Sequence, residues 1–330
     1  MTATENTHLI TTPSKTSRLA VVDSLRGVAA LSVVWCHLAG FGVFAASARY
    51  GWLGVYIFFV VSGFILPYTL FQADYKISSY GKFLLKRICR IDPPYFLSIA
   101  LEIGFVYLAS LSPMFKVGAP SFTWKQILMH VGYLNAFTGG PWIIGVFWTL
   151  GIEFQYYLLI GILFPVFASK SRLLESIVFL PLLIILLEHH EFALRPRGEQ
   201  GGLIFPYAFV FLMGIFTFKY RSGLTGRRAY LVSLLLVSLC AAACQGPIIA
   251  LTALSTALLI AFAHFRSRIL EWVGMISYSL YLIPLLSGYK LNRFNWLELS
   301  SRSSWESEGW RACKMGVFSK SVTLKICRIW

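Results

Sequence analysis

Residues 52–72 read WLGVYIFFVVSGFILPYTLFQ, a stretch without a single charged side chain. A helix that crosses a hydrocarbon layer of about 30 Å needs roughly 20 such apolar residues. Comparable stretches recur along residues 25–289, with short polar interruptions between them. The pattern predicts an all-α fold, a polytopic transmembrane helix bundle.

Composition supports this reading, because 57% of the residues are hydrophobic and only 13% are charged. That charged fraction is about half of the value for an ordinary soluble domain, which excludes a water-soluble globule. A weaker amphipathic segment at 123–138 is expected to be re-entrant or interfacial. About nine spans are expected, at 25–46, 52–72, 93–111, 142–168, 173–188, 202–219, 229–245, 247–265 and 272–289.

The net charge of +15 could indicate a nucleic-acid partner. The basic residues, however, fall between apolar spans and form no stripe or arm, so they favour membrane topology over nucleic-acid binding. With a cytoplasmic N-terminus, five Lys and Arg lie outside and 16 lie inside, the latter being Lys15, Arg18, Arg26, Lys76, Lys82, Lys86, Arg87, Arg90, Lys170, Arg172, Lys219, Arg221, Arg227, Arg228, Arg266 and Arg268.

Three regions are expected along the chain. Residues 1–24 form a cytoplasmic segment that lacks the apolar core of a cleavable signal peptide, and residues 25–289 form the membrane domain. Residues 290–330 carry eight Lys or Arg and no uncharged run longer than five residues, so no span is expected there. We expect this tail to be disordered or foreign to the fold, and its deletion from 291 to leave membrane insertion intact.

Arg26 and His37 are eleven residues apart in the first span, which on a helix places them on nearly the same face, about 16 Å apart. The expectation is an Arg26 at the cytoplasmic interface and a His37 near mid-membrane. An ionisable residue at that depth is costly and is a functional candidate. The structural alternative is a neutral histidine that bonds to a neighbouring helix.

Three cations fall within residues 86–90, just before Pro93 and Pro94. Anchoring at the inner surface would explain them. The functional alternative is a phosphate clamp made by Arg87 and Arg90, since Arg offers planar, bidentate donors, with Tyr95 as a nearby hydrogen-bond donor.

Glu153 stands inside a long apolar span, where a lone carboxylate is expensive unless it is paired or protonated. A structural partner on a neighbouring helix and a role at the site are both open. Glu102 has a similar setting and is interpreted as structural. The six cysteines show no metal-ligand spacing and are read as reduced thiols.

Five ordered blocks give these residues a context. They are DSLRGVAA at 23–30 followed by His37, FFVVSGF at 58–64, KRICRIDPPY at 86–95, WTLGIEFQYYL at 148–158 and GMISYSLYL at 274–282. In order and spacing the chain resembles the membrane-bound acyltransferase-3 family, a bacterial glycan O-acyltransferase type.

The resemblance implies an enzyme of the bacterial inner membrane. It would move an acyl group, with acetyl expected, from acyl-CoA to a hydroxyl of a glycan or lipid-linked saccharide, with no permanent cofactor and no metal. His37 would be the general base, or would form an acyl-histidine. Glu153 would orient His37 or bind the acceptor hydroxyl. Coenzyme A would contact Arg26, Arg87, Arg90 and Tyr95.

The chain departs from the family after residue 282. The family usually has ten spans and continues the last block with a histidine and a further span, whereas Ile283 and Pro284 follow here. Two other functions therefore compete with the enzyme. One is an inactive remnant, and the other is a transporter that uses His37, Glu102 and Glu153 as a proton relay.

Overall fold

The computed structural model describes residues 15–38, 45–111, 122–171, 184 and 202–282. Within these ranges every regular element is a helix, which confirms the all-α fold class. Five helices are long and apolar enough to cross a membrane, at Ala20–His37, Gly51–Gln72, Ile77–Leu108, Phe147–Ala168 and Arg227–Gln245. The protein is a polytopic helical membrane protein.

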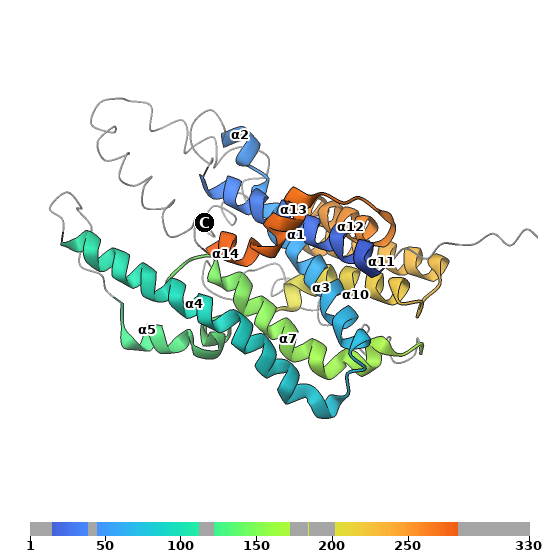
Figure 1. Cartoon of the computed structure of the whole chain (residues 1–330), viewed down its shortest axis with the longest axis horizontal. Coiled ribbons are helices and arrows are strands. Elements are labelled where there is room, and N and C mark those ends of the chain that lie inside the picture. Colours follow the sequence, from blue (N-terminus) through green and yellow to red (C-terminus); the bar gives the residue numbers. More distant parts are fainter. Residues whose placement is uncertain (1–14, 39–44, 112–121, 172–183, 185–201, 283–330) are drawn as a thin grey trace, which may run out of the picture.

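The longer helices are α1 (Lys15–Leu38), α3 (Gly54–Gln72), α4 (Tyr80–Ser110), α7 (Phe147–Ala168), α10 (Ala208–Arg221), α11 (Arg227–Gln245), α12 (Pro247–Phe262) and α13 (Arg268–Met275). Shorter helices join them: α2 (Ala45–Ala48), η2 (Gly51–Leu53), η3 (Ile77–Ser79), α5 (Trp124–Met129), η4 (Val131–Tyr133), α6 (Leu134–Thr138), η6 (Phe205–Tyr207) and α14 (Ser277–Leu282). Helix α3 is central, because it contacts α1, α7, α10 and α12. Figure 1 shows α4 and α7 side by side on one flank, with α11, α12 and α13 on the other.

Helices α3 and α10 are in close contact. A Cβ added to Gly63 would lie 2.3 Å from the carbonyl oxygen of Phe211, and one added to Gly214 would lie 2.3 Å from that of Val60. Two glycines therefore let the backbones touch, as small residues do between membrane helices. Gly63 and Gly214 thus form the packing surface between the two helices.

One end of the bundle, here called the basic end, is where α3 and α7 finish and α4 and α11 begin. The Nζ of Lys219 donates to the carbonyl of Ser169 over 2.7 Å, and Arg221 donates to the carbonyl of Ala261 over 2.8 Å. Helix α1 finishes and α7 begins at the opposite end. Lys219 and Arg221, which the sequence predicted on the same side, therefore lie at the same end of the bundle.

Helix α4 corrects one predicted boundary, since it begins at Tyr80 and not at Pro93. Both Pro93 and Pro94 lie inside the helix, although each lacks an N–H for the carbonyl four residues earlier. The cations that suggested a surface segment are spaced four apart on one exposed helix face, at Lys82, Lys86 and Arg90. Phe83 on another face is buried in the core.

The span expected at 272–289 is also corrected. Residues 268–282 form two short helices, α13 and α14, which Ile276 separates. Helix α1 begins at Lys15, so the segment expected at 1–24 ends within a helix. Apart from Ile184, the span expected at 173–188 lies outside the described residues, and so does the tail 290–330.

Candidate active site

Helix α1 carries Arg26 in its middle and His37 as its last residue but one. Eleven residues precede Arg26 in the helix, and eleven more lead from Arg26 to His37. The end of α1 packs on η2, where a Cβ on Gly51 would meet Cys36 at 2.7 Å. His37 thus lies near the opposite end of the bundle, about 16 Å along α1 from Arg26.

Helix α14 connects Arg26 to α4. The guanidinium of Arg26 donates to Ser277 Oγ over 3.3 Å, and the Tyr278 hydroxyl donates to the carbonyl of Ile91 over 2.9 Å. Ile91 directly follows Arg90. The block at 274–282 therefore joins α1 to α4 next to Arg90. The sequence alone did not predict this role.

Arg87 lies half-buried between α3, α4 and α7. Its guanidinium donates to Thr69 Oγ1 over 3.4 Å and lies 5.7 Å from the ring centre of Phe83 and 5.9 Å from that of Tyr157. It also interacts electrostatically with Glu153. Aromatic faces and a nearby carboxylate stabilise a cation that has left water.

Glu153 accepts two hydrogen bonds within the same group. Its Oε1 receives the Tyr157 hydroxyl at 2.5 Å and the Ser62 hydroxyl at 3.3 Å. The cost of burying this carboxylate is offset by these donors and by Arg87. Tyr157 contacts both Glu153 and Arg87, so the fold places these two candidates near each other through a shared neighbour.

His37 is not brought to Glu153. Glu153 bonds to Ser62, eleven residues along α3 from Gly51, whereas the end of α1 lies at Gly51. Eleven helical residues correspond to about 16 Å in depth. The expected role of Glu153 in orienting His37 would require a contact that this arrangement does not provide.

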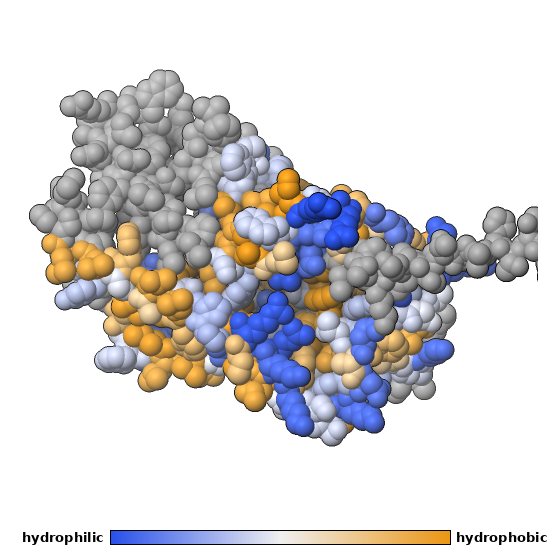
Figure 2. All heavy atoms as spheres, viewed as in Figure 1, coloured by the Kyte–Doolittle hydropathy of each residue, from blue (hydrophilic) through white to orange (hydrophobic). Residues whose placement is uncertain are grey.

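Arg90 is exposed on α4, one turn from Arg87. Figure 2 shows hydrophilic side chains gathered over the first part of α4 near the basic end, and hydrophobic ones over its later part. The exposed apolar residues of that later part include Leu97, Leu101, Phe105 and Leu108. Arg90 and Lys86 are therefore the exposed cations of this helix that lie within one turn of Arg87.

Tyr95 does not lie with the arginines. It is fully buried among aromatic side chains, with ring centres 4.5 Å from Phe147, 4.9 Å from Tyr133 and 6.1 Å from His130. Eight residues separate it from Arg87 along α4, about 12 Å. Two of these neighbours, His130 and Tyr133, come from the segment 123–138, which the sequence marked as re-entrant or interfacial, and Phe147 begins α7.

That segment adds residues that sequence reasoning missed. Tyr133, in η4, donates its hydroxyl to Asp92 Oδ1 over 3.0 Å and packs at 4.9 Å on Phe154. Since Phe154 adjoins Glu153, the segment reaches deep between α4 and α7. Asp92, a carboxylate inside the block at 86–95, was the available sequence signal.

His130 joins the segment 123–138 to the backbone at Ile143. Its Nδ1 donates to the carbonyl of Gln126 over 2.8 Å and its Nε2 accepts the N–H of Ile143 at 3.2 Å, which requires the neutral tautomer. Burial lowers the pKa of His130, against the opposing effect of the Gln126 carbonyl. His130 is a structural residue.

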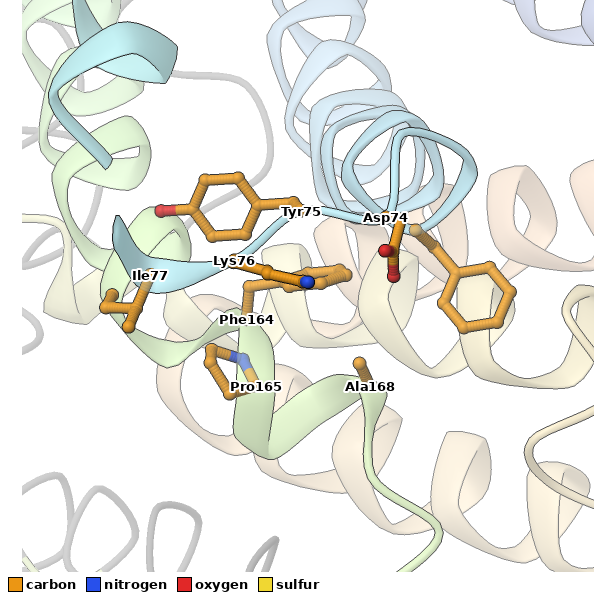
Figure 3. A pocket seen from close by; sticks show the side chains of 8 residues that line it. Asp74, Tyr75, Lys76, Ile77, Phe164, Pro165 and Ala168 are labelled. Carbon is orange, nitrogen blue, oxygen red and sulfur yellow. The ribbon is translucent and has the colours of Figure 1, made fainter. Parts of the chain in front are cut away.

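A hollow of about 500 Å³ opens at the basic end, in the turn after α3. Figure 3 shows Asp74, Tyr75 and Lys76 in that turn, beside Phe164, Pro165 and Ala168 of α7. None of the six candidate residues lines it. Within the described part of the chain, no group of three His, Cys, Asp or Glu side chains could hold a metal ion.

Most of the chain matches a known protein family. Residues 19–301 match the acyltransferase-3 family, described as an acyltransferase domain. The match covers all five blocks, and it ends inside the segment 290–330. No solved structure matches the chain.

Three curated relatives are similar over part of their length. The chain is 29% identical to a candidate peptidoglycan O-acetyltransferase of Bacillus subtilis over 163 residues, covering 46% of this chain and 25% of the relative. It is 28% identical to the O-acetyltransferase OatA of Staphylococcus aureus over 176 residues, covering 50% and 28%. A candidate acetyltransferase of Acidianus two-tailed virus is 33% identical over 144 residues, covering 43% and 40%. The chain therefore spans less than half the length of these relatives.

Proposed function

This chain belongs to the acyltransferase-3 family of membrane-bound acyltransferases, and we propose that it transfers an acetyl group from acetyl-CoA to a hydroxyl of a glycan or lipid-linked saccharide. Relatives named for O-acetylation of peptidoglycan support acetyl as the acyl group. The membrane would be the bacterial cytoplasmic one, with the N-terminus inside.

The observation that carries the proposal is the pair Arg87 and Arg90, one helical turn apart near the basic end. Coenzyme A presents several phosphates, and guanidinium groups bind phosphate bidentately. Arg90 is exposed and would make the first contact, while Arg87 is half-buried and would hold the phosphate nearest the bundle. Glu153 and Tyr157 would then be positioning residues for Arg87.

Arg26 would take a deeper contact with the donor. Ser277 and Tyr278 link Arg26 to the backbone of Ile91, so Arg26 lies at the depth of Ile91. Ile91 is one residue further into the bundle than Arg90. A pantetheine arm that starts at Arg90 would pass Arg26 and approach the end of α1. We therefore propose that Arg26 contacts the pantetheine arm, and that Arg87 and Arg90 bind the phosphates of coenzyme A.

His37 would act as general base near the opposite end. Its imidazole would take the proton of the acceptor hydroxyl while that oxygen attacks the thioester carbonyl. The carbon–sulfur bond breaks, the acyl group passes to the oxygen, and the proton returns to the thiolate of coenzyme A. An acyl-histidine intermediate would divide the same transfer into two steps.

The test replaces His37 by Ala and follows labelled acetyl from acetyl-CoA into acceptor in membrane vesicles. We expect the rate to fall by at least about a hundredfold, the usual effect of losing a general base. His264→Ala is the matched control, because His264 is exposed at the basic end. A wild-type rate in a correctly inserted His37 variant would contradict the proposal, and solute flux without thioester cleavage would favour a transporter.

A further inference from the structure

The Tyr95 hydroxyl is the starting observation. It is fully buried, and its oxygen has no hydrogen-bond partner within the described part of the chain. An unpaired buried hydroxyl is unfavourable and is uncommon in folded proteins. Tyr95 therefore calls for a partner that the described residues do not supply.

Asp92 lies close to this hydroxyl. The two residues are three apart on α4, and long helical side chains lean toward the helix N-terminus, which directs Tyr95 toward Asp92. Asp92 interacts electrostatically with both Tyr95 and Tyr133. Its side chain is half-buried and accepts one hydrogen bond, from Tyr133, although a carboxylate has about four acceptor positions.

Tyr133 reaches Asp92 from an unfavourable backbone conformation. Its φ is 57°, in the left-handed region that bulky residues rarely occupy. Such an outlier persists only where the surroundings impose it, and it points to a functional role. Here the conformation delivers one phenol hydroxyl to a carboxylate deep between α4 and α7.

We propose that Asp92 and Tyr95 form the hydroxyl-binding site for the acyl acceptor, and that the Tyr133 hydroxyl occupies it in the present structure. The inference rests on the proposed function and names its acceptor site. Asp92 would accept a hydrogen bond from one acceptor hydroxyl, in the place of the phenol. Tyr95 would bond to a neighbouring hydroxyl and gain the partner that it lacks.

The surroundings favour a sugar. The rings of Tyr95, Tyr133, Phe147 and His130 lie together beside Asp92, and aromatic faces suit the apolar faces of sugar rings. Two or more adjacent hydroxyls are what a carboxylate and a phenol together can bind. The site lies between the arginines and the end at which α1 carries His37, roughly 10 Å short of that end, so it would hold a sugar ring other than the one acylated at His37.

Tyr133 can leave the site because flexible points bracket its helix. Gly132 and Gly139 flank Tyr133 and α6, with φ values of 64° and 69°. A Cβ on either glycine would meet no atom within 4 Å, so glycine is favoured there by its positive φ and not by a lack of room. Rotation at these two residues would withdraw the Tyr133 hydroxyl from Asp92.

The test measures binding of radiolabelled chitotriose, a soluble trisaccharide with free hydroxyls, to the full chain in lipid nanodiscs. Asp92→Asn and Tyr95→Phe should each weaken it about tenfold, the loss of one hydrogen bond near a charged group. Tyr133→Phe should tighten it severalfold, because the competing hydroxyl is gone. Tyr107→Phe on exposed α4 surface is the control, and acetyl-CoA affinity should stay constant in all four variants.

If these residues form a binding site, Tyr133→Phe should tighten trisaccharide binding. If they form only a structural cluster, all three variants should weaken it. Tyr95→Phe should also leave thermal stability unchanged or raised, since it removes an unpaired oxygen. Unchanged trisaccharide affinity in Asp92→Asn and Tyr95→Phe overturns the inference, as does a wild-type chain that binds no trisaccharide. Variant effects as expected, in a chain that consumes no acetyl-CoA, would support the hydroxyl site and contradict the proposed function.

Discussion

Arg87 illustrates at the residue scale how a cation is kept inside an apolar bundle. Two aromatic rings, the Thr69 hydroxyl and the Glu153 carboxylate surround its guanidinium. Thr69 takes one of the five guanidinium N–H donors, so a phosphate could bind to the donors along the remaining edge. A primary ammonium could not reproduce this combination.

Arg87→Lys should therefore raise the KM for acetyl-CoA about tenfold while kcat changes little, because binding of the donor is lost and the base is not. Steady-state transfer assays in vesicles measure both constants. Lys82→Ala, an exposed cation on the same helix, is the control and should keep both constants. Equal KM values in Arg87→Lys and wild type would remove Arg87 from the donor site.

His130 gives a pH-dependent prediction. Burial lowers its pKa below the usual 6.5, so the unfolded chain binds its proton first on acidification. The stability that neutral His130 provides is present above pH 6.5 and is lost as the pH falls from there toward the folded pKa. His130→Gln cannot titrate, so its melting temperature should fall less between pH 7.5 and pH 5 than that of wild type. Equal slopes in the two proteins would contradict this.

At the scale of elements, α4 and α14 carry the site. Helix α4 supplies Arg87, Arg90, Asp92 and Tyr95 from one continuous helix that passes two prolines. Helix α14 is a single short helix, yet it contacts both α1 and α4. Bonds from Arg26 and to Ile91 fix its position, which explains why the chain breaks at Ile276 and does not continue as one long span.

The α3–α10 contact gives the prediction at this scale. Gly63→Ala places a methyl group 2.3 Å from a backbone carbonyl, so the helices must separate, at a cost of about 1–3 kcal/mol. Gly81→Ala is the matched control, since a Cβ there meets nothing within 4 Å. It should stabilise α4 by about 0.5–1 kcal/mol. Thermal unfolding in detergent distinguishes them, and equal melting temperatures would contradict the close contact.

The two ends of the molecule differ in charge, because the cations gather at the basic end. Cations of α4, α10 and α11 meet at one end because antiparallel helices bring alternate connections to the same side. The positive-inside rule then predicts that the basic end faces the cytoplasm. This orientation also places the exposed Arg90 where cytosolic acetyl-CoA can reach it.

Cysteine labelling tests that orientation. Lys82→Cys lies at the basic end and Thr138→Cys near the opposite end, and both positions are exposed. A membrane-impermeant maleimide applied to intact cells should label Thr138→Cys, and should label Lys82→Cys only after permeabilisation. A background in which all six native cysteines are replaced by Ser keeps the signal specific. The reverse labelling pattern would invert the topology and the direction of the reaction.

The sequence predicted most of the long helices, because apolar length alone distinguishes a membrane helix. Residues 52–72, 229–245 and much of 142–168 were identified in this way. The start of α4 was missed, because its cations resemble a surface segment until their four-residue spacing is placed on a helix face. The break at Ile276 was missed because the bonds that cause it come from residues 185 or more positions away in the chain.

The sequence by itself determined the membrane class, the family and the identity of the candidate residues, because hydrophobic length and local motifs are properties of neighbouring residues. Only the tertiary structure decided which of these residues meet. It placed Glu153 and Arg87 against the same tyrosine, Tyr157, and it placed the Tyr133 hydroxyl on Asp92. Depth in a bundle depends on where each helix begins and on which partner it packs against, and neither is encoded in the spacing along one helix.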